Sequence, residues 1–238
     1  MGKNVRGRRI MAKTHMPLRE GSVISLKVEE VHPNPVLKML GTINENVKTI
    51  NTSMILTGLK KNLWKTIIEN IEQKHLDIVR TLLPIQQQSA TLSIVKQLIN
   101  EIEANCEGLF MLKELSPRMK DKIVCYGELL SSKIISATFA AKGIKQQWVD
   151  ARELIKTDSN FLNAVVDKAL TNKTIQDYFK NPANAFDLYI APGFISSDKE
   201  GNTTTLGRGG SDYTGAIFAA ALDAERLNLD GCKWYDDR

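Results

Sequence analysis

Residues 203–214 read TTTLGRGGSDYT, and they place a glycine-rich turn directly before a segment that can form a helix. Ser211 is a residue type that caps helices, and the apolar residues after it predict a helix that continues to about Leu227. Before this stretch, residues 186–191 form an apolar run typical of a buried strand, which Pro192 ends. A buried strand followed by a glycine-rich turn and a helix is typical of an α/β fold.

The glycine-rich turn has the composition of an anion-binding site. Its glycines let the backbone approach a ligand closely, and the free amide groups at a helix start carry partial positive charge. Arg208 can bind a carboxylate or phosphate with two parallel hydrogen bonds, and Asp212 adds a carboxylate that could orient a lysine or face Mg²⁺. The alternative is a glycine-rich turn with an ordinary polar cap, and the turn by itself fits both interpretations.

The first half of the chain has a strong helical pattern. Apolar side chains recur at spacings of three and four over residues 62–83 and 89–109, which predicts two amphipathic helices separated by Pro84. Ser116-Pro117 fits an N-cap and a first helical position, with a helix that runs to about Ala140. Further expected elements include one more helix at residues 163–179 and two short strands at 36–40 and 147–150. Helices alternating with short buried strands predict a layered α/β fold.

Positive charge is concentrated at the start of the chain. The whole sequence has a formal net charge of +5, and Lys and Arg residues within residues 1–20 supply the excess. We expect residues 1–21 to form a basic, disordered tail; the alternative is an arm that binds nucleic acid or a membrane surface. Because the remainder is nearly neutral, we expect no nucleic-acid partner.

The composition also bears on cellular location. No apolar run reaches the length of a membrane span, and the N-terminal region lacks the apolar segment of a secretory signal, so we expect no membrane partner. Cys106, Cys125 and Cys232 are widely separated and match no metal-ligand spacing, so no metal site is expected. Sparse cysteines favour the reducing cytoplasm. His75 falls on the apolar stripe of a predicted helix, and we expect it in the core or at its boundary.

The stretch at 203–214 closely resembles the aspartate kinase signature of the amino-acid kinase family, and the residues on either side of it, 191–195 and 219–225, also match. Residues 126–132, YGELLSS, resemble the family's Tyr/Phe-Gly-Glu-x-x-Ser segment. Residues 40–44, LGTIN, are more weakly similar to its Ser-Ala-Leu-Gly-Gly-Ile-Thr loop. Together the resemblance covers about residues 36–227.

This resemblance implies a three-layer α/β/α sandwich of the amino-acid kinase type, incomplete at both ends. The helical stretch at 62–142 resembles the helical insertion of these enzymes, especially those fused to homoserine dehydrogenase. The implied catalytic domain is residues 22–227. The implied activity is phosphorylation of the aspartate side-chain carboxylate to 4-phospho-aspartate, the first step of the lysine, threonine and methionine pathway. ATP and Mg²⁺ are the implied cofactors, aspartate and ATP the partners, and a homo-oligomer the state of full-length members.

The resemblance also assigns roles to individual residues. Glu128 is expected to hold the substrate ammonium group; the alternative is a helix-face carboxylate in water. Arg208 is expected to bind a substrate carboxylate, with Ser211 supporting the same end, and Asp212 to lie near the phosphate-contacting lysine. Arg208 and Asp212 are therefore the candidate catalytic residues. The candidate phosphate-binding and ATP-binding residues are Gly207, Gly209 and Gly210.

Two segments depart from the family at the phosphate side. The family opens with a strand carrying Lys-Phe-Gly-Gly-Thr-Ser-Val-Gly, whose lysine contacts the transferred phosphoryl group, and residues 1–25 contain no such sequence. Lys38 and Met39 stand where the family has Ser-Ala, and Thr42 replaces a glycine. We therefore expect the phosphate-binding edge of the site to be missing or rewritten.

The third departure is at the end of the chain. Residues 228–238 do not match the family's next strand, but one choice of codons for them, read one base later, encodes TWMDVNGMMT, which is close to it. We expect a frameshift after about Leu227, an aberrant tail at 228–238, and little kinase activity from this chain alone. The competing hypotheses are another amino-acid kinase, a non-catalytic amino-acid-binding relative, and a nucleic-acid binder that uses the basic tail.

Overall fold

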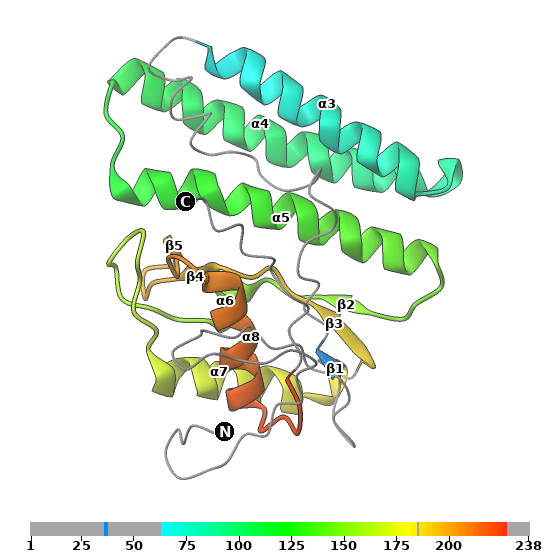
Figure 1. The fold of residues 1–238 in the computed structure, drawn as a ribbon, viewed down its shortest axis with the longest axis vertical. Helices are drawn as coiled ribbons and strands as arrows, with labels where there is room; N and C mark the ends of the chain where they lie inside the picture. Colours follow the sequence, from blue (N-terminus) through cyan, green and yellow to red (C-terminus); the bar gives the residue numbers. More distant parts are fainter. Residues whose placement is uncertain (1–35, 38–62, 185, 228–238) are drawn as a thin grey trace, which may run out of the picture.

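Short strands lie between two groups of helices in the computed structural model, which describes residues 36–37, 63–184 and 186–227 (Figure 1). The helices on one side are α3 (Trp64–Leu82), α4 (Gln88–Leu112) and α5 (Pro117–Ala141). Those on the other side include α7 (Lys168–Lys180) and α8 (Gly210–Ala221). This layering confirms the α/β class and the helical stretch predicted at 62–142.

Several expectations fall outside the described residues. These are the basic tail at 1–21, the start of the catalytic domain at 22, the loop at 40–44 and the C-terminal segment at 228–238. They therefore stay predictions. Only β1 (Val36–Leu37) represents the chain before residue 63.

The parallel sheet has the strand order β1–β3–β2, with β3 (Leu188–Ile190) in the centre and β2 (Gln147–Trp148) at the other edge. Tyr189 pairs with Leu37 on one side and with Gln147 on the other. Tyr189 and Ile190 are buried, as expected for a central strand covered by helices on both faces. The three strands confirm the strands predicted in these segments, and β2 and β3 are shorter than predicted.

A separate antiparallel hairpin leads to the glycine-rich turn. It joins β4 (Ile195–Ser197) to β5 (Thr203–Thr205). The turn closes around Asp198, whose carboxylate accepts hydrogen bonds from the backbone amides of Glu200 and Asn202 at 3.0 and 2.8 Å. Burial favours the neutral form of Asp198, but hydrogen bonds from the side chain of Asn202 and from these amides hold its pKa below its usual value. The hairpin ends at Thr205, directly before the glycine-rich turn.

Helices α3 and α4 form an antiparallel hairpin across the short 3₁₀ turn η1 (Ile85–Gln87). Each helix buries one stripe at helical spacing, and the buried set includes Ile68, Ile71, Val79, Val95, Ile99 and Ile102. Burying one such side chain stabilises the fold by about 1.5–3 kcal/mol relative to leaving it in water. His75 lies in the same stripe, as predicted; its Nδ1 is 2.8 Å from the carbonyl oxygen of Ile71, and burial lowers its pKa.

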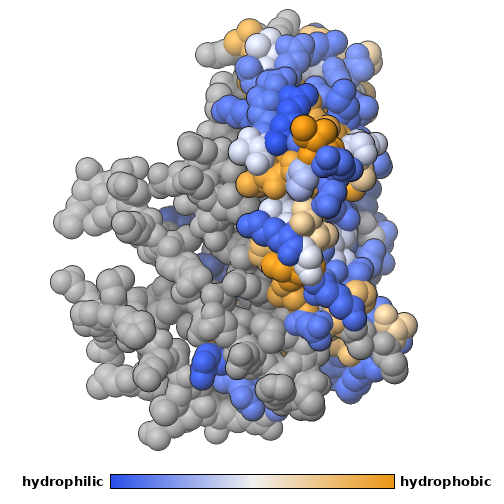
Figure 2. Space-filling model, turned by 90° about the vertical axis from the view of Figure 1, so that its right-hand side faces the viewer, coloured by the Kyte–Doolittle hydropathy of each residue, from blue (hydrophilic) through white to orange (hydrophobic). Residues whose placement is uncertain are grey.

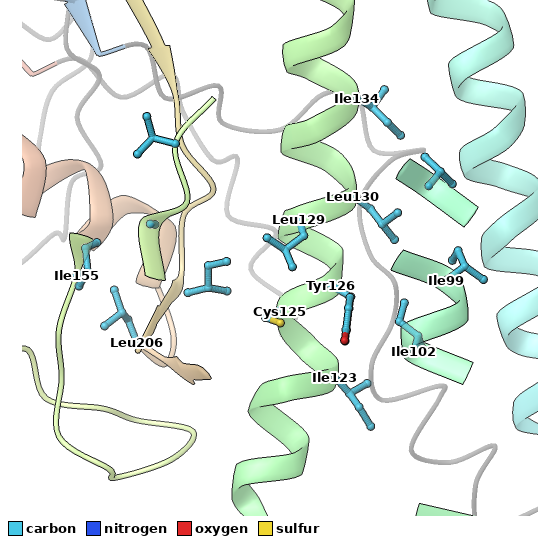
Figure 3. Close-up of a cluster of buried hydrophobic side chains, with 14 of the residues drawn as sticks. Ile99, Ile102, Ile123, Cys125, Tyr126, Leu129, Leu130, Ile134, Ile155 and Leu206 are labelled. Atoms are coloured by element: carbon cyan, nitrogen blue, oxygen red, sulfur yellow. The ribbon is translucent and has the colours of Figure 1, made fainter. Parts of the chain in front are cut away.

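Helix α5 packs on both sides. Ser116 caps it as predicted, accepting a hydrogen bond from the amide of Met119 at 3.3 Å. Figure 3 shows one side of α5 facing Ile99 and Ile102 of α4 and the other side facing the strands. The side chains labelled on the α4 side are Ile123, Tyr126, Leu130 and Ile134, and those on the strand side are Cys125 and Leu129. By length and hydropathy α5 could span a bilayer, contrary to our expectation, but half of that stretch is buried, as in a core helix.

The layer that contains α7 corrects one prediction. We expected a helix from residue 163, but α7 begins at Lys168 because Asp167 caps it, accepting a hydrogen bond from the amide of Leu170 at 3.1 Å. Val166 instead bridges Thr157 in extended backbone. The short helix α6 (Ala151–Leu154) was not predicted; Asp150 caps it through the amide of Arg152.

The coloured part of the face in Figure 2 is mostly hydrophilic, with scattered apolar patches. The turn between α3 and α4 and the segment after α5 lie on this side of the molecule in Figure 1. Both carry exposed apolar side chains, Ile85 and Ile144. Single exposed apolar residues are common on protein surfaces and indicate no site by themselves.

Candidate functional site

The glycine-rich turn takes a left-handed backbone at two positions. Gly207 has a φ of 72° and Gly209 a φ of 75°, which favour glycine over residues with a side chain. The amide of Gly210 donates a hydrogen bond to the carbonyl oxygen of Gly207 at 3.1 Å. The amide of Tyr213 donates one to the carbonyl oxygen of Gly209 at 3.0 Å. The turn therefore delivers the chain from β5 directly into α8.

This geometry corrects the predicted cap of α8. Gly209 is the N-cap, no side chain caps the helix, and Ser211 lies inside the first turn. The helix also ends at Ala221, before the predicted Leu227, because Asp223 has a φ of 53°. The polar residue after the glycines therefore points to a helix start correctly but misplaces it by two residues.

Gly210 is where Phe194 meets the start of α8. A Cβ placed on Gly210 would lie 2.7 Å from the ring of Phe194 and 3.1 Å from Cβ of Leu206. Phe194 itself has a φ of 69°, a strained value for a bulky residue. Its amide donates to Oγ1 of Thr214 at 3.0 Å, which fixes the loop after β3 against α8. The site is therefore held by close backbone packing.

The start of α8 offers amide donors to a ligand. Within the described ranges, the amides of Ser211 and Asp212 donate to no backbone or side-chain acceptor. A Cβ on Gly209 would meet no described atom within 4 Å, so a ligand can approach the backbone there. Arg208 is exposed, and Ser211 and Asp212 are half-buried. A carboxylate or phosphate is the ligand class that fits free amides, a helix start and a guanidinium.

Glu128 lies on the side of α5 that faces the segment after β2. Asp121, Cys125, Glu128 and Ser132 follow one another at spacings of four, three and four, which places them on one stripe of the helix. One turn before Glu128, Sγ of Cys125 is 4.0 Å from Nη1 of Arg152. One turn after it, Oγ of Ser132 accepts a hydrogen bond from Nε1 of Trp148 at 3.0 Å.

This stripe lies beside the carboxyl ends of the parallel strands. Asp150 follows β2 by two residues, and Arg152 binds it with two nitrogens, the shorter distance being 2.6 Å. Arg152 also donates to Oγ1 of Thr203 at 3.4 Å, so this ion pair joins the end of β2 to the start of β5. Ligands of open α/β sheets bind beyond the carboxyl ends of the strands, which is where Glu128 lies.

The carboxyl group of Glu128 is electrostatically unusual. It is half-buried, and no described group donates a hydrogen bond to it. Burial raises the pKa of Glu128 to about 7, because the ionised form has lost water without gaining a partner. The substrate-binding role of Glu128 and the alternative, a helix-face carboxylate in water, both stay predictions. Buried acids with a raised pKa are typical of functional sites.

The described structure links Glu128 to the glycine-rich turn through Asp121. Oδ1 of Asp121 accepts from the hydroxyl of Thr205 at 2.6 Å, and Oδ2 accepts from the amide of the same residue at 3.2 Å. Arg208, Ser211, Asp212 and the three glycines thus share one segment, and Glu128 comes from a helix anchored to that segment. Sequence reasoning missed Asp121; its signal is an acidic residue on the buried stripe of an amphipathic helix.

The described residues suggest no metal centre. None of the described ranges holds a group of three His, Cys, Asp or Glu side chains that could hold a metal ion. Cys106 and Cys125 are buried free thiols, and burial raises the pKa of Cys106 to about 11. These thiols are therefore protonated core residues near neutral pH.

The sequence of this chain resembles those of known proteins. Residues 37–229 match the amino acid kinase family. Lysine-sensitive aspartokinase 3 of Escherichia coli is 30% identical over 204 residues, which are 83% of this chain and 44% of that protein. Bifunctional aspartokinase/homoserine dehydrogenase of Buchnera aphidicola is 28% identical over 219 residues, which are 84% of this chain and 26% of that protein.

A solved structure also resembles the described fold. The structure of E. coli aspartokinase III in complex with aspartate and ADP superposes with a TM-score of 0.65 at 27% identity. The match covers 74% of this chain and 39% of the solved chain. The chain therefore spans less than half the length of these relatives.

Proposed function

Because the chain belongs to the amino acid kinase family, we propose that it carries the aspartate-binding part of an aspartate kinase, which moves the γ-phosphoryl group of ATP onto the side-chain carboxylate of aspartate. The observation that carries this proposal is the half-buried carboxyl group of Glu128, which no described group satisfies. A substrate ammonium would supply the missing partner. Arg208 and the amides at the start of α8 would then hold a carboxylate of the same molecule.

The chemistry needs positioning more than proton transfer. An unperturbed aspartate carboxyl has a pKa near 3.9, so at neutral pH it is already a nucleophile and needs no general base. The difficulty is the approach of one anion to another. An enzyme can overcome this repulsion with oriented amides, a guanidinium and positive charge placed beside the phosphates. These groups hold the reactants in line and stabilise the developing charge.

The residues of the turn fit the phosphate side of such a reaction. Among the candidate phosphate-binding glycines, Gly209 leaves its backbone open to a phosphate, while Gly207 and Gly210 let the turn pack against Asn163 and Phe194. Asp212 is the carboxylate at the helix start that could face Mg²⁺. Bound ATP would supply the phosphoryl group, and Mg²⁺ would neutralise charge on its phosphates. We further propose that the protein works in the cytoplasm as a homo-oligomer, in the first step of lysine, threonine and methionine formation.

The test is aspartate binding by this chain, measured calorimetrically. Arg208→Ala is expected to weaken aspartate binding about 10- to 150-fold, because a charged hydrogen-bonding group is worth roughly 1.5–3 kcal/mol. Arg226→Ala, which removes the same charge from an exposed position, is the matched control and should bind aspartate like the parent chain. Equal binding by the Arg208 variant and the parent would contradict the proposed role. Binding of glutamate or N-acetylglutamate in preference to aspartate would favour a different amino-acid kinase.

Aspartate affinity is expected to rise with pH between 6 and 8. With a pKa of about 7, Glu128 is mostly protonated at pH 6 and mostly ionised at pH 8, and only the ionised form attracts an ammonium. The apparent Kd scales inversely with the competent fraction, so it should fall about tenfold across this range. Titrations at several pH values test this, with Glu128→Gln as the control that should show weak, pH-independent binding. A flat profile for the parent chain would exclude Glu128 as the titrating group.

A further inference from the structure

Asp121 is a fully buried acidic residue that holds two separate segments beside the glycine-rich turn. Its Oδ1 accepts from the hydroxyl of Thr205 at 2.6 Å, and its Oδ2 accepts from the amide of Leu162 at 2.8 Å and from that of Thr205 at 3.2 Å. We propose that Asp121 is a positioning residue that fixes the turn at 206–209 relative to α5, and thereby sets how Arg208 faces Glu128. This inference rests on the proposed function, because that function gives these two residues one substrate.

The first support is that both bound segments border Gly207. Thr205 precedes the turn directly, and the chain around Leu162 covers it from the other side, since a Cβ on Gly207 would lie 2.6 Å from Oδ1 of Asn163. The amide of Ala164 donates to the carbonyl of Thr205 at 2.9 Å, which joins the two segments to each other. The carboxylate of Asp121 therefore binds the segments on both sides of Gly207.

The second support is the placement of Asp121 and Glu128 on the same rigid helix. They lie seven residues apart, or about 10.5 Å along α5 at 1.5 Å per residue. Arg208 lies three residues beyond Thr205, in the turn that follows β5. A clamp between Asp121 and Thr205 therefore links the position of Arg208 to that of Glu128 through α5.

The third support is that a carboxylate is a costly choice for a purely structural contact. Burial raises the pKa of Asp121, and its three hydrogen bonds only partly offset that cost. An apolar side chain could fill the same space, but it would not fix two backbone amides in one geometry. Buried polar groups of this kind are best attested where they specify one arrangement.

The alternation of side chains along β5 supplies a matched control. Thr205 turns toward α5, whereas the hydroxyl of its neighbour Thr204 lies 2.7 Å from Oγ1 of Thr157 and 2.9 Å from Oγ of Ser196. Ser196→Ala therefore removes a buried hydroxyl contact from the same hairpin without touching Asp121. Thr205→Val removes the hydroxyl that Asp121 binds, and Thr205→Ser keeps it.

The experiment compares these three variants of the whole chain by amide hydrogen exchange without ligand and by calorimetric titration with aspartate. Thr205→Val should speed exchange at 206–210 at least tenfold relative to the α3–α4 hairpin and raise the aspartate Kd about tenfold. Thr205→Ser should restore both values, and Ser196→Ala should change neither, even if it lowers stability equally. If Thr205→Val does not fold, Asp121→Asn tests the same bonds while preserving side-chain shape.

The two readouts separate this inference from the proposed function. If the parent chain does not bind aspartate but Thr205→Val still loosens residues 206–210 selectively, the positioning role stands and the proposed substrate fails. If the parent binds aspartate and Thr205→Val behaves like Ser196→Ala, the proposed function stands and the positioning role is overturned.

Discussion

Replacing Glu128 with glutamine is expected to make the protein more stable and at the same time to weaken aspartate binding strongly. The folded protein raises the pKa of Glu128 from 4.5 to about 7, so ionising this group opposes folding at neutral pH. A full shift of that size corresponds to roughly 3 kcal/mol, and because the side chain is only half-buried we expect about 1–2 kcal/mol of added stability at pH 8. Losing the charge should weaken aspartate binding at least about 100-fold, or roughly 3 kcal/mol.

The stability gain of the Glu128→Gln variant should depend on pH. Below pH 4.5 the carboxyl group is protonated in both folded and unfolded chains, so the variant should gain nothing there; the gain should grow as the pH rises toward 7 and then level off. Urea unfolding at pH 4.5 and pH 8 measures it. Glu107→Gln, on an exposed face of α4, is the control and should change stability little at either pH. A Glu128→Gln protein that is less stable at pH 8 would show that the carboxylate stabilises the fold.

The second large effect is expected from Gly210→Ala. The new methyl group would lie 2.7 Å from the Phe194 ring and 3.2 Å from its Cα, and Phe194 already has a strained backbone. Overpacking of this kind costs about 1–3 kcal/mol, and here the relaxation must move the turn that presents Arg208. We therefore expect both lower stability and loss of measurable aspartate binding.

Alanine substitutions at two other glycines provide a comparison for Gly210→Ala. Gly209→Ala meets no described atom but keeps a φ of 75°, so it should cost only about 1–2 kcal/mol. Gly108 lies within α4 with open space around it, and Gly108→Ala should stabilise the helix by about 0.5–1 kcal/mol. In urea unfolding and in aspartate titration, Gly210→Ala should be the most impaired variant, Gly209→Ala the next and Gly108→Ala the least. A Gly210→Ala protein with normal stability and binding would contradict the tight packing at this turn.

Local patterns were sufficient for the long helices. The apolar spacing at 62–83 and 89–109 predicts α3 and α4 closely, because a long apolar stripe at the helical period is incompatible with the two-residue period of a strand. Ser116-Pro117 likewise locates the start of α5, since a proline at the first helical position loses no hydrogen bond. These features depend on residues close in sequence.

The errors occur where distant residues decide the outcome. Ser211 is a good cap in isolation, but Gly209 caps α8 because Phe194, from another loop, fixes the backbone of Gly210. Asp121 lies on the buried stripe of α5, but its partners Thr205 and Leu162 are brought to it only by the fold. Glu128 could be singled out only through the family resemblance, because its raised pKa depends on burial that no local pattern specifies.

The α3–α4 hairpin packs against α5, the helix that carries Glu128 (Figure 3). The hairpin therefore cannot be deleted without exposing part of α5. Joining the chain before Trp64 directly to Ser116 would uncover the side of α5 that holds Ile123, Leu130 and Ile134. The shortened protein would then present an apolar surface to water and would need charged replacements there to remain dispersed. A deletion of the hairpin during evolution would expose the same apolar surface of α5. We therefore expect the hairpin and the helix to be inherited, exchanged or lost together.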